Sequence, residues 1–319
     1  MSKPKLALYW AASCGGCEIA ILELHEKVLA IPEHFELVFW PVAMDTKYAD
    51  VEAMESGSID ICLFNGAVRS SENERLALML RDRAKLLVAF GSCAHEGCIP
   101  ALANTTTKQE ILRTVFHDSP STPNQNGAEP QTTYALPEGE VELPELWESV
   151  RALDQVVEVD YYIPGCPPQP HRIWEVIEAI VGGAALPPPG SVIGAGQETC
   201  CDECARTREE KRIRRFVRPH EIVPDPEICL LDQGMVCMGP ATRSGCGALC
   251  PAVNVPCRGC YGPPPHVRDA GAKMCSALAS VIDSTDEAEV EQILDQIVDP
   301  VGTFYRFGMS HSTLRRVQK

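Results

Sequence analysis

Ala12-Ser13-Cys14-Gly15-Gly16-Cys17-Glu18 is a turn that carries two cysteines and joins an apolar run, 6–10, to a helical pattern beginning at Glu18. This is the position of the first strand-to-helix turn in a doubly wound α/β fold, where backbone N–H groups and the positive end of the helix dipole favour an anion. Nucleotide-binding folds have a glycine-rich phosphate loop here, whereas this turn holds thiols. A metal centre or iron-sulfur cluster held by thiolates is also negatively charged, so the same backbone geometry suits it.

Two more cysteines follow the ends of later predicted strands. Cys93 comes just after the apolar run 85–90, and Cys166 comes just after the run 156–163. Ligands of open parallel sheets bind beyond the carboxyl ends of the strands, so these cysteines and the first pair are expected at one site. Four thiolates at one point predict a tetrahedral metal centre. The four cysteines are Cys14, Cys17, Cys93 and Cys166.

The first part of the chain alternates between strand and helix patterns, which predicts a flavodoxin-like, doubly wound parallel sheet of the α/β class. The expected strands are 6–10, 35–42, 59–64, 85–90 and 156–163. The expected helices are 18–29, 47–56, 72–83 and 172–181. Residues 105–145 hold no sustained period and predict a long loop, with short helices at 108–116 and 143–153 beside it.

The run Leu186-Pro187-Pro188-Pro189-Gly190 ends this pattern and predicts a domain boundary. Residues 1–187 are expected to form the flavodoxin-like domain, and residues 188–319 a smaller, irregular, cysteine-rich iron-sulfur domain. Ten of the sixteen cysteines lie between Cys200 and Cys275, so this part would need metal clusters as folding nuclei. One surface helix is expected at 286–298, and the basic tail 313–319 is expected to be ordered only against a partner.

Composition limits the class of protein and the kind of partner. A net charge of −16 over 319 residues argues against nucleic acid or an anionic membrane surface as a partner. The sequence has no apolar run of about 18 residues, so no membrane span is expected. The first strand begins without a signal region before it, so a cytoplasmic location is expected. Cysteines in a reducing compartment are more often ligands than disulfides.

The second half of the chain repeats the C-x-x-C spacing of the first turn. Counting from Cys201, eight cysteines divide into two sets of four thiolates. The first set is Cys201, Cys204, Cys229 and Cys237; the second is Cys246, Cys250, Cys257 and Cys260. Two zinc ribbons, or a thioredoxin-like dithiol at Cys14 and Cys17, are alternatives. Iron-sulfur clusters account for all three sites together, because thiolate-bound clusters in a row can pass electrons.

Five short motifs taken together resemble the small subunit of nickel-iron hydrogenases. They are Cys14-Gly-Gly-Cys17-Glu18, Gly91-Ser-Cys93-Ala, Pro164-Gly-Cys166-Pro-Pro, Ala241-Thr-Arg-Ser-Gly-Cys246-Gly and Pro256-Cys257-Arg-Gly-Cys260-Tyr-Gly-Pro. The sequence is most similar to the cytoplasmic methyl-viologen-reducing type that associates with heterodisulfide reductase. The NADP-linked sulfhydrogenase type and a quinone-reductase-like cluster subunit are the alternatives.

The resemblance implies a relay of three 4Fe–4S clusters and no catalytic residue on this chain. Cys14, Cys17, Cys93 and Cys166 would hold a proximal cluster facing the nickel-iron centre of a separate large subunit, which would cover these loops. The medial cluster would use Cys246, Cys250, Cys257 and Cys260, and the distal cluster Cys201, Cys204, Cys229 and Cys237. The implied partners are the hydrogenase large subunit, an electron-accepting iron-sulfur subunit and heterodisulfide reductase.

The distal site departs from the pattern of the periplasmic relatives. Those relatives have histidine as the first distal ligand, where this chain has Cys201 with Cys200 as a neighbouring rival, and Cys237 falls two residues late. Glu18 is adjacent to the proximal site, where a carboxylate could carry protons, but an exposed or helix-start glutamate is the more common role for this position. The remaining cysteines, Cys62, Cys98, Cys200 and Cys275, are expected to be buried free thiols.

Overall fold

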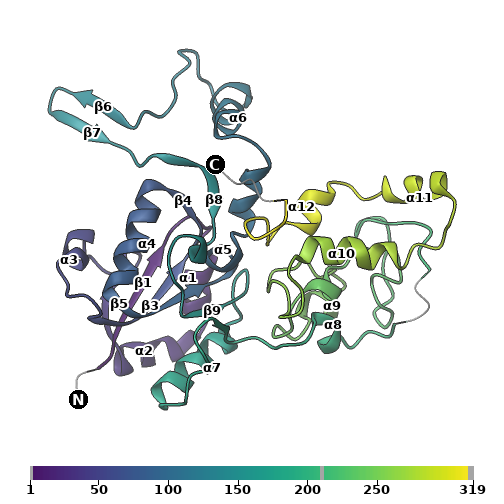
Figure 1. Cartoon of the computed structure of the whole chain (residues 1–319), viewed down its shortest axis with the longest axis horizontal. Coiled ribbons are helices and arrows are strands. Elements are labelled where there is room, and N and C mark those ends of the chain that lie inside the picture. Colours follow the sequence, from purple (N-terminus) through teal and green to yellow (C-terminus); the bar gives the residue numbers. More distant parts are fainter. Residues whose placement is uncertain (1–2, 209–211, 315–319) are drawn as a thin grey trace.

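A computed structural model describes residues 3–208 and 212–314, and its centre is a six-stranded parallel sheet (Figure 1). The strand order is β10-β9-β5-β3-β1-β2. The strands are β1 (Lys5–Trp10), β2 (Glu36–Phe39), β3 (Ile59–Asn65), β5 (Ala84–Phe90), β9 (Tyr161–Ile163) and β10 (Ser191–Val192). Without the short edge strand β10, this is the flavodoxin order. The predicted α/β fold class is confirmed.

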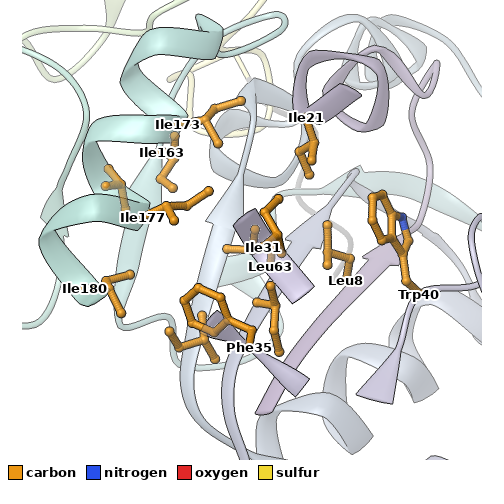
Figure 2. Close-up of a pocket in the computed structure, with 13 residues that line it drawn as sticks. Leu8, Ile21, Ile31, Phe35, Trp40, Leu63, Ile163, Ile173, Ile177 and Ile180 are labelled. Carbon is orange, nitrogen blue, oxygen red and sulfur yellow. The ribbon is translucent and has the colours of Figure 1, made fainter. Parts of the chain in front are cut away.

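Both faces of the sheet are covered by helices because the strands are apolar on both sides. In β1, Leu6 and Leu8 face one layer, while Ala7 and Tyr9 face the other. The first layer contains α1 (Gly16–Leu22), α2 (Ala30–His34) and α7 (Pro170–Val181), and the second contains α3 (Tyr48–Glu52) and α4 (Ser71–Arg83). Figure 2 shows side chains of the first layer around an apolar hollow of about 520 Å³ against the sheet.

The segment expected to be a helix at 143–153 is instead a strand, β8 (Leu146–Arg151). It pairs antiparallel with β4 (Val68–Ser70). The side chain of Asn104 also accepts from the backbone N–H of Val150 (2.7 Å) and donates to the carbonyl of Val150 (2.9 Å). Both backbone groups of Val150 are thus hydrogen-bonded while this residue is in an extended conformation. Tertiary hydrogen bonds therefore override a helical pattern that was weak in the sequence.

The poorly patterned segment after Cys98 contains more regular structure than expected. The 3-10 helix η2 (Ile99–Thr105) comes first. Helix α6 (Lys108–Arg113) and the π-helical segment η3 (Thr114–Asp118) then form the helix predicted at 108–116. The hairpin β6 (Thr133–Leu136) and β7 (Gly139–Glu142) follows and was not predicted. Every residue of the two hairpin strands is exposed, and the hairpin extends away from the sheet (Figure 1).

The second half of the chain consists of short helices joined by long irregular segments (Figure 1). The helices are α8 (Cys200–Glu203), η5 (Gly239–Ala241), α9 (Leu249–Ala252), α10 (Ala270–Ala279), α11 (Glu287–Leu294) and α12 (Pro300–Phe304). Its apolar core around Met274 and Leu278 also takes in Ala101 and Val150 from the first half, so the two halves are packed together.

The predicted domain boundary at residue 187 stays a prediction. Strand β10, which follows it, still pairs with β9 at the edge of the sheet. The predicted helix 286–298 is present as the shorter α11. Of the basic tail 313–319, residues 315–319 lie outside the described residues. No helix in the described ranges is long and apolar enough to cross a membrane.

Candidate metal centres

The first set of cysteines meets at the carboxyl edge of the sheet. Cys14 lies in the turn after β1, Cys17 in α1, Cys93 in α5 (Ser92–Glu96) and Cys166 in the loop after β9. Burial raises the pKa of the Cys17 thiol, and the neighbouring Cys93, Cys166 and Cys14 raise it further through their charge. The structure therefore brings together the four cysteines that the topology predicts at one point.

Glycine makes room for these thiols. A Cβ atom on Gly91 would lie 2.3 Å from Sγ of Cys17, and Gly91 has a φ of 83° that disfavours other residues. The backbone N–H of Ser92 donates to the carbonyl of Gly165 (2.8 Å), which ties the loop after β5 to the loop after β9. Cys93 and Cys166 are thus held at fixed positions beside each other.

Glu18 lies in the first turn of α1, as expected, but it is buried rather than exposed. Its carboxylate accepts from Nε1 of Trp40 (2.6 Å) and from Nδ2 of Asn65 (3.5 Å). Burial raises the pKa of Glu18, and these two hydrogen bonds oppose the shift. The sequence does not predict this burial, because Trp40 just after β2 and Asn65 at the end of β3 are distant from Glu18 along the chain.

The second set surrounds the loop before α9 and the Pro256-Cys257 segment. Burial and the charge of Cys257 and Cys246 raise the pKa values of Cys250 and Cys260. These four thiols therefore lie within electrostatic range of one another. Nε of Arg172 on α7 donates to the carbonyl of Gly245 (2.9 Å), which fixes this loop against the flavodoxin-like part.

The third set lines one small hollow, which Cys200 also lines. The cysteines that line it include Cys201, Cys204, Cys229 and Cys237. A Cβ on Gly239 would lie 2.9 Å from Sγ of Cys201, so this glycine also makes room for thiols. Burial raises the pKa of Cys201 to about 11, and the charge of Arg208 partly opposes the shift.

The three sets touch one another in a fixed order. Between the first and second sets, Oγ of Ser92 donates to the carbonyl of Cys260, and the backbone of Cys166 lies beside the Cys260 thiol. Between the second and third sets, the backbone N–H of Cys257 donates to Sγ of Cys237 (3.3 Å). The set that is last in sequence is therefore the middle set in space.

Of the remaining cysteines, Cys62, Cys98 and Cys200 are buried and free, as expected, whereas Cys275 is not buried. Cys98 is buried beside Cys93 and Cys166, and Cys200 is buried beside Cys246 and Cys257, so each is a fifth thiol at a set of four. The thiol of Cys200 thus lies beside the second set, although Cys200 also lines the hollow of the third set, where it was a predicted rival of Cys201. Cys275 is exposed on α10, so its predicted burial is wrong, whereas Cys62 is buried in β3 as expected.

The donor sets fit thiolate-held iron-sulfur clusters. All sixteen cysteines are free, and each set offers four soft sulfur donors; at the first and third sets glycine leaves space beside the thiols. Within residues 3–208 and 212–314, no group of three or more His, Cys, Asp or Glu side chains is arranged for a single metal ion. The hollow in Figure 2 is lined by hydrocarbon and Trp40 and offers no metal ligand.

Comparison with known proteins gives the family. A family model described as NADH ubiquinone oxidoreductase, 20 Kd subunit, matches residues 14–180. The iron-sulfur subunit of the F420-non-reducing hydrogenase of Archaeoglobus profundus is 43% identical over 318 residues, which cover 98% of each chain. The chain belongs to this family of hydrogenase iron-sulfur subunits. The corresponding subunit of the F420-non-reducing hydrogenase of Methanothermobacter marburgensis is 36% identical over 310 residues, with 96% of this chain and 94% of that protein covered.

A solved structure agrees with this membership. A chain of the NAD+-reducing nickel-iron hydrogenase in the H2-reduced state aligns with a TM-score of 0.50 and 30% identity, covering 59% of this chain and 97% of that chain. The predicted resemblance is confirmed, and the chain is a hydrogenase subunit, part of an oxidoreductase complex. The quinone-reductase name belongs to a model that ends before the cysteine-rich half, whereas the hydrogenase relatives match that half as well.

Proposed function

We propose that this chain is the electron-transfer subunit of a cytoplasmic nickel-iron hydrogenase. It would carry electrons from H2 oxidation at a separate large subunit, through three 4Fe–4S clusters, to an electron-accepting iron-sulfur subunit and heterodisulfide reductase. The observation that supports this most is the contact order of the three cysteine sets. A relay needs its redox groups in a row, and the thiols lie in a row although their order in sequence is different.

Each set has a role in this proposal. Cys14, Cys17, Cys93 and Cys166 would hold the proximal cluster, Cys246, Cys250, Cys257 and Cys260 the medial cluster, and Cys201, Cys204, Cys229 and Cys237 the distal cluster. When bound, such clusters accept and release single electrons. The chain's own contribution is to fix the thiols, to bury some of them and to bring neighbouring sets into contact.

The proximal end is suited to face a large subunit. Cys14 is exposed at the sheet edge, and exposed apolar side chains lie near it in sequence: Trp10 is 41% exposed and Ile19 is 56% exposed. A surface that receives electrons from another protein must lie at the boundary with that protein. Large apolar side chains on such a surface are typical of a stable interface.

Metal analysis of the complex, purified without oxygen, tests the proposal. Three sets of four thiolates predict that each copy of this chain contributes about twelve irons and no zinc, since each cubane holds four irons, in addition to the iron of the nickel-iron centre and of any iron-sulfur partner. The protein should be brown, with a broad visible absorption that H2 bleaches. About two zincs per chain would contradict the proposal, and so would about eight irons.

A further inference from the structure

The third cysteine set has an open side. A groove of about 1070 Å³ runs past it, and the thiols of Cys201, Cys229 and Cys237 form one wall. Cys201 and Cys229 are partly exposed, whereas Cys237 is buried. A redox group held by these thiols would therefore be reached from this groove.

Helix α10 and the residue after it also line this groove. Lys273, Ser276, Ala277 and Ser280 line the groove, and their spacing of three and four residues places them on one face of the helix. Apart from Lys273 these side chains are short. A polypeptide segment that enters the groove would therefore come close to the backbone of α10 and to the thiols of the third set.

The charge of the groove opposes that of the chain. Arg208 and Lys273 line it together with the imidazole of His266, and Asp232 is the one carboxylate among the lining side chains in the described part of the chain. The whole chain carries a net charge of −16. An acidic protein that approaches this chain would be repelled by most of its surface and attracted here, which favours one docking position.

A second basic cleft shows that charge alone does not define this groove. That cleft has a volume of about 1020 Å³, and Arg218, Arg258 and Arg306 line it. It contains none of the cysteines proposed as ligands. Of these two clefts, only the first combines positively charged side chains with cysteines of a proposed set.

We propose that the groove between α10 and the third cysteine set docks an acidic segment of the protein that accepts electrons from this chain. Carboxylates of the partner pair with Lys273 and Arg208, and the short side chains of α10 let the partner's own redox group approach the distal thiols. This inference rests on the proposed function and adds the docking surface and the chemistry of the partner.

Zero-length cross-linking of the intact complex tests the contact directly. A carbodiimide joins an amine to a carboxylate only where the two are in contact, so mass spectrometry should find the Lys273 amine linked to an Asp or Glu of an iron-sulfur partner chain. A link from Lys273 to the large subunit or to a second copy of this chain would overturn the inference. So would an unlinked Lys273 in a complex whose other interface lysines are linked.

Charge reversal tests the function of the contact. Lys273→Glu should lower the H2-driven reduction of the partner on the order of tenfold at low ionic strength, and the difference should shrink in high salt because the attraction is screened. Arg218→Glu in the second cleft makes the same change of charge and should leave the rate within about twofold.

Two readouts separate this inference from the proposed function. Methyl viologen, a small dication, should be reduced by the Lys273→Glu complex at no less than the wild-type rate, and the iron content should stay the same. If the unsubstituted complex contains no iron in this chain and does not reduce methyl viologen with H2, the proposed function fails. If they are normal and the two variants reduce the partner equally well, only the docking surface is wrong.

Discussion

Two adjacent residues, Cys200 and Cys201, face different thiol sets. Both lie in the short helix α8, where neighbouring side chains point about 100° apart. Cys201 lies with Cys204 and Cys229, whereas Cys200 lies between Cys246 and Cys257. The thiol of Cys200 lowers the pKa values of Cys246 and Cys257 by hydrogen bonding to them. Cys200 therefore acts as a donor toward the second set.

Alanine substitution should separate these two roles. Cys201→Ala should remove the distal cluster, with a loss of up to about four irons per chain, because one of four thiolates is missing. Cys200→Ala should keep all the irons, but the reduction potential of the medial cluster should fall, because hydrogen bonds to coordinating sulfur stabilise the reduced state. Iron analysis and redox titration followed by electron paramagnetic resonance measure both effects. Equal iron loss in the two variants would contradict the assignment.

The sequence predicts the sets of cysteines more readily than the neighbours of each cysteine. Strand ends and C-x-x-C spacing are visible in the sequence, and the proposed grouping into three sets of four rests on them and on the family resemblance. The positions of Cys98 and Cys200 depend on how two loops fold back, and neither loop has a pattern that fixes its direction. Glu18 is buried for the same reason, since Trp40 and Asn65 reach it from other strands.

At the scale of elements, the buried strands of the central sheet could be predicted from the sequence. The exposed hairpin strands, and the strand that pairs with a partner distant in sequence, could not. Strands β3 and β5 are mostly apolar because both their faces are covered, and that pattern is strong over a few residues. Strand β8 pairs with β4, far away in sequence, and its conformation depends on Asn104. The exposed hairpin β6–β7 has polar, mixed strands that the sequence does not separate from a loop.

Helix α5 joins the first cysteine set to the second half of the chain. It carries Cys93 and, one turn later, Glu96, which is only 5% exposed. A Cβ on Gly262 would lie 2.9 Å from Oε1 of Glu96, so the carboxylate is in contact with the second half of the chain. Burial raises the pKa of Glu96 to about 7; His311 and Arg243 oppose the shift, and Asp154 and Asp269 add to it.

This carboxylate should make stability depend on pH. In the unfolded chain Glu96 ionises near pH 4.5, whereas in the folded chain it ionises near pH 7. The folded state therefore holds the proton more tightly, and the free energy of unfolding should fall as pH rises through this window. Glu96→Gln removes this titration. The free energy of unfolding of the variant should therefore rise relative to that of wild type as pH increases, by about 3 kcal/mol at most above pH 7.

Anaerobic thermal unfolding at pH 5 and pH 8 measures this effect in the wild-type and Glu96→Gln proteins. Glu138→Gln, in the exposed turn between β6 and β7, is the matched control and should unfold like wild type at both values. A Glu96→Gln protein that loses as much stability as wild type between pH 5 and pH 8 would show that Glu96 is already ionised at pH 5.

At the scale of the whole molecule, the three sets extend from the sheet edge into the cysteine-rich half. The sheet holds the first set, and contacts through Cys260 and Cys237 continue the row. A row of electron carriers needs one partner at each end. The third set opens on a basic groove, whereas the region around the first set exposes apolar side chains, so the two ends are suited to partners of different chemistry.

The apolar end gives the last prediction. Ile19 and Leu22 lie on the exposed side of α1, with exposed fractions of 56% and 58%, next to Cys17 in sequence. If the large subunit covers them, Ile19→Asp places a charge in the interface and loses the transfer free energy of the isoleucine, about 3 kcal/mol or more in total. The large subunit should then bind on the order of 100-fold more weakly and fail to co-purify.

Leu78→Asp is the matched control, because Leu78 is 54% exposed and lies on α4, on the other side of the sheet. Its complex should keep the large subunit and the H2-dependent activity. In the Ile19→Asp protein the chain itself should still fold, since an exposed side chain contributes little to the free energy of unfolding. An Ile19→Asp complex that stays intact while the Leu78→Asp complex dissociates would place the large subunit on the α4 side, away from the first cysteine set.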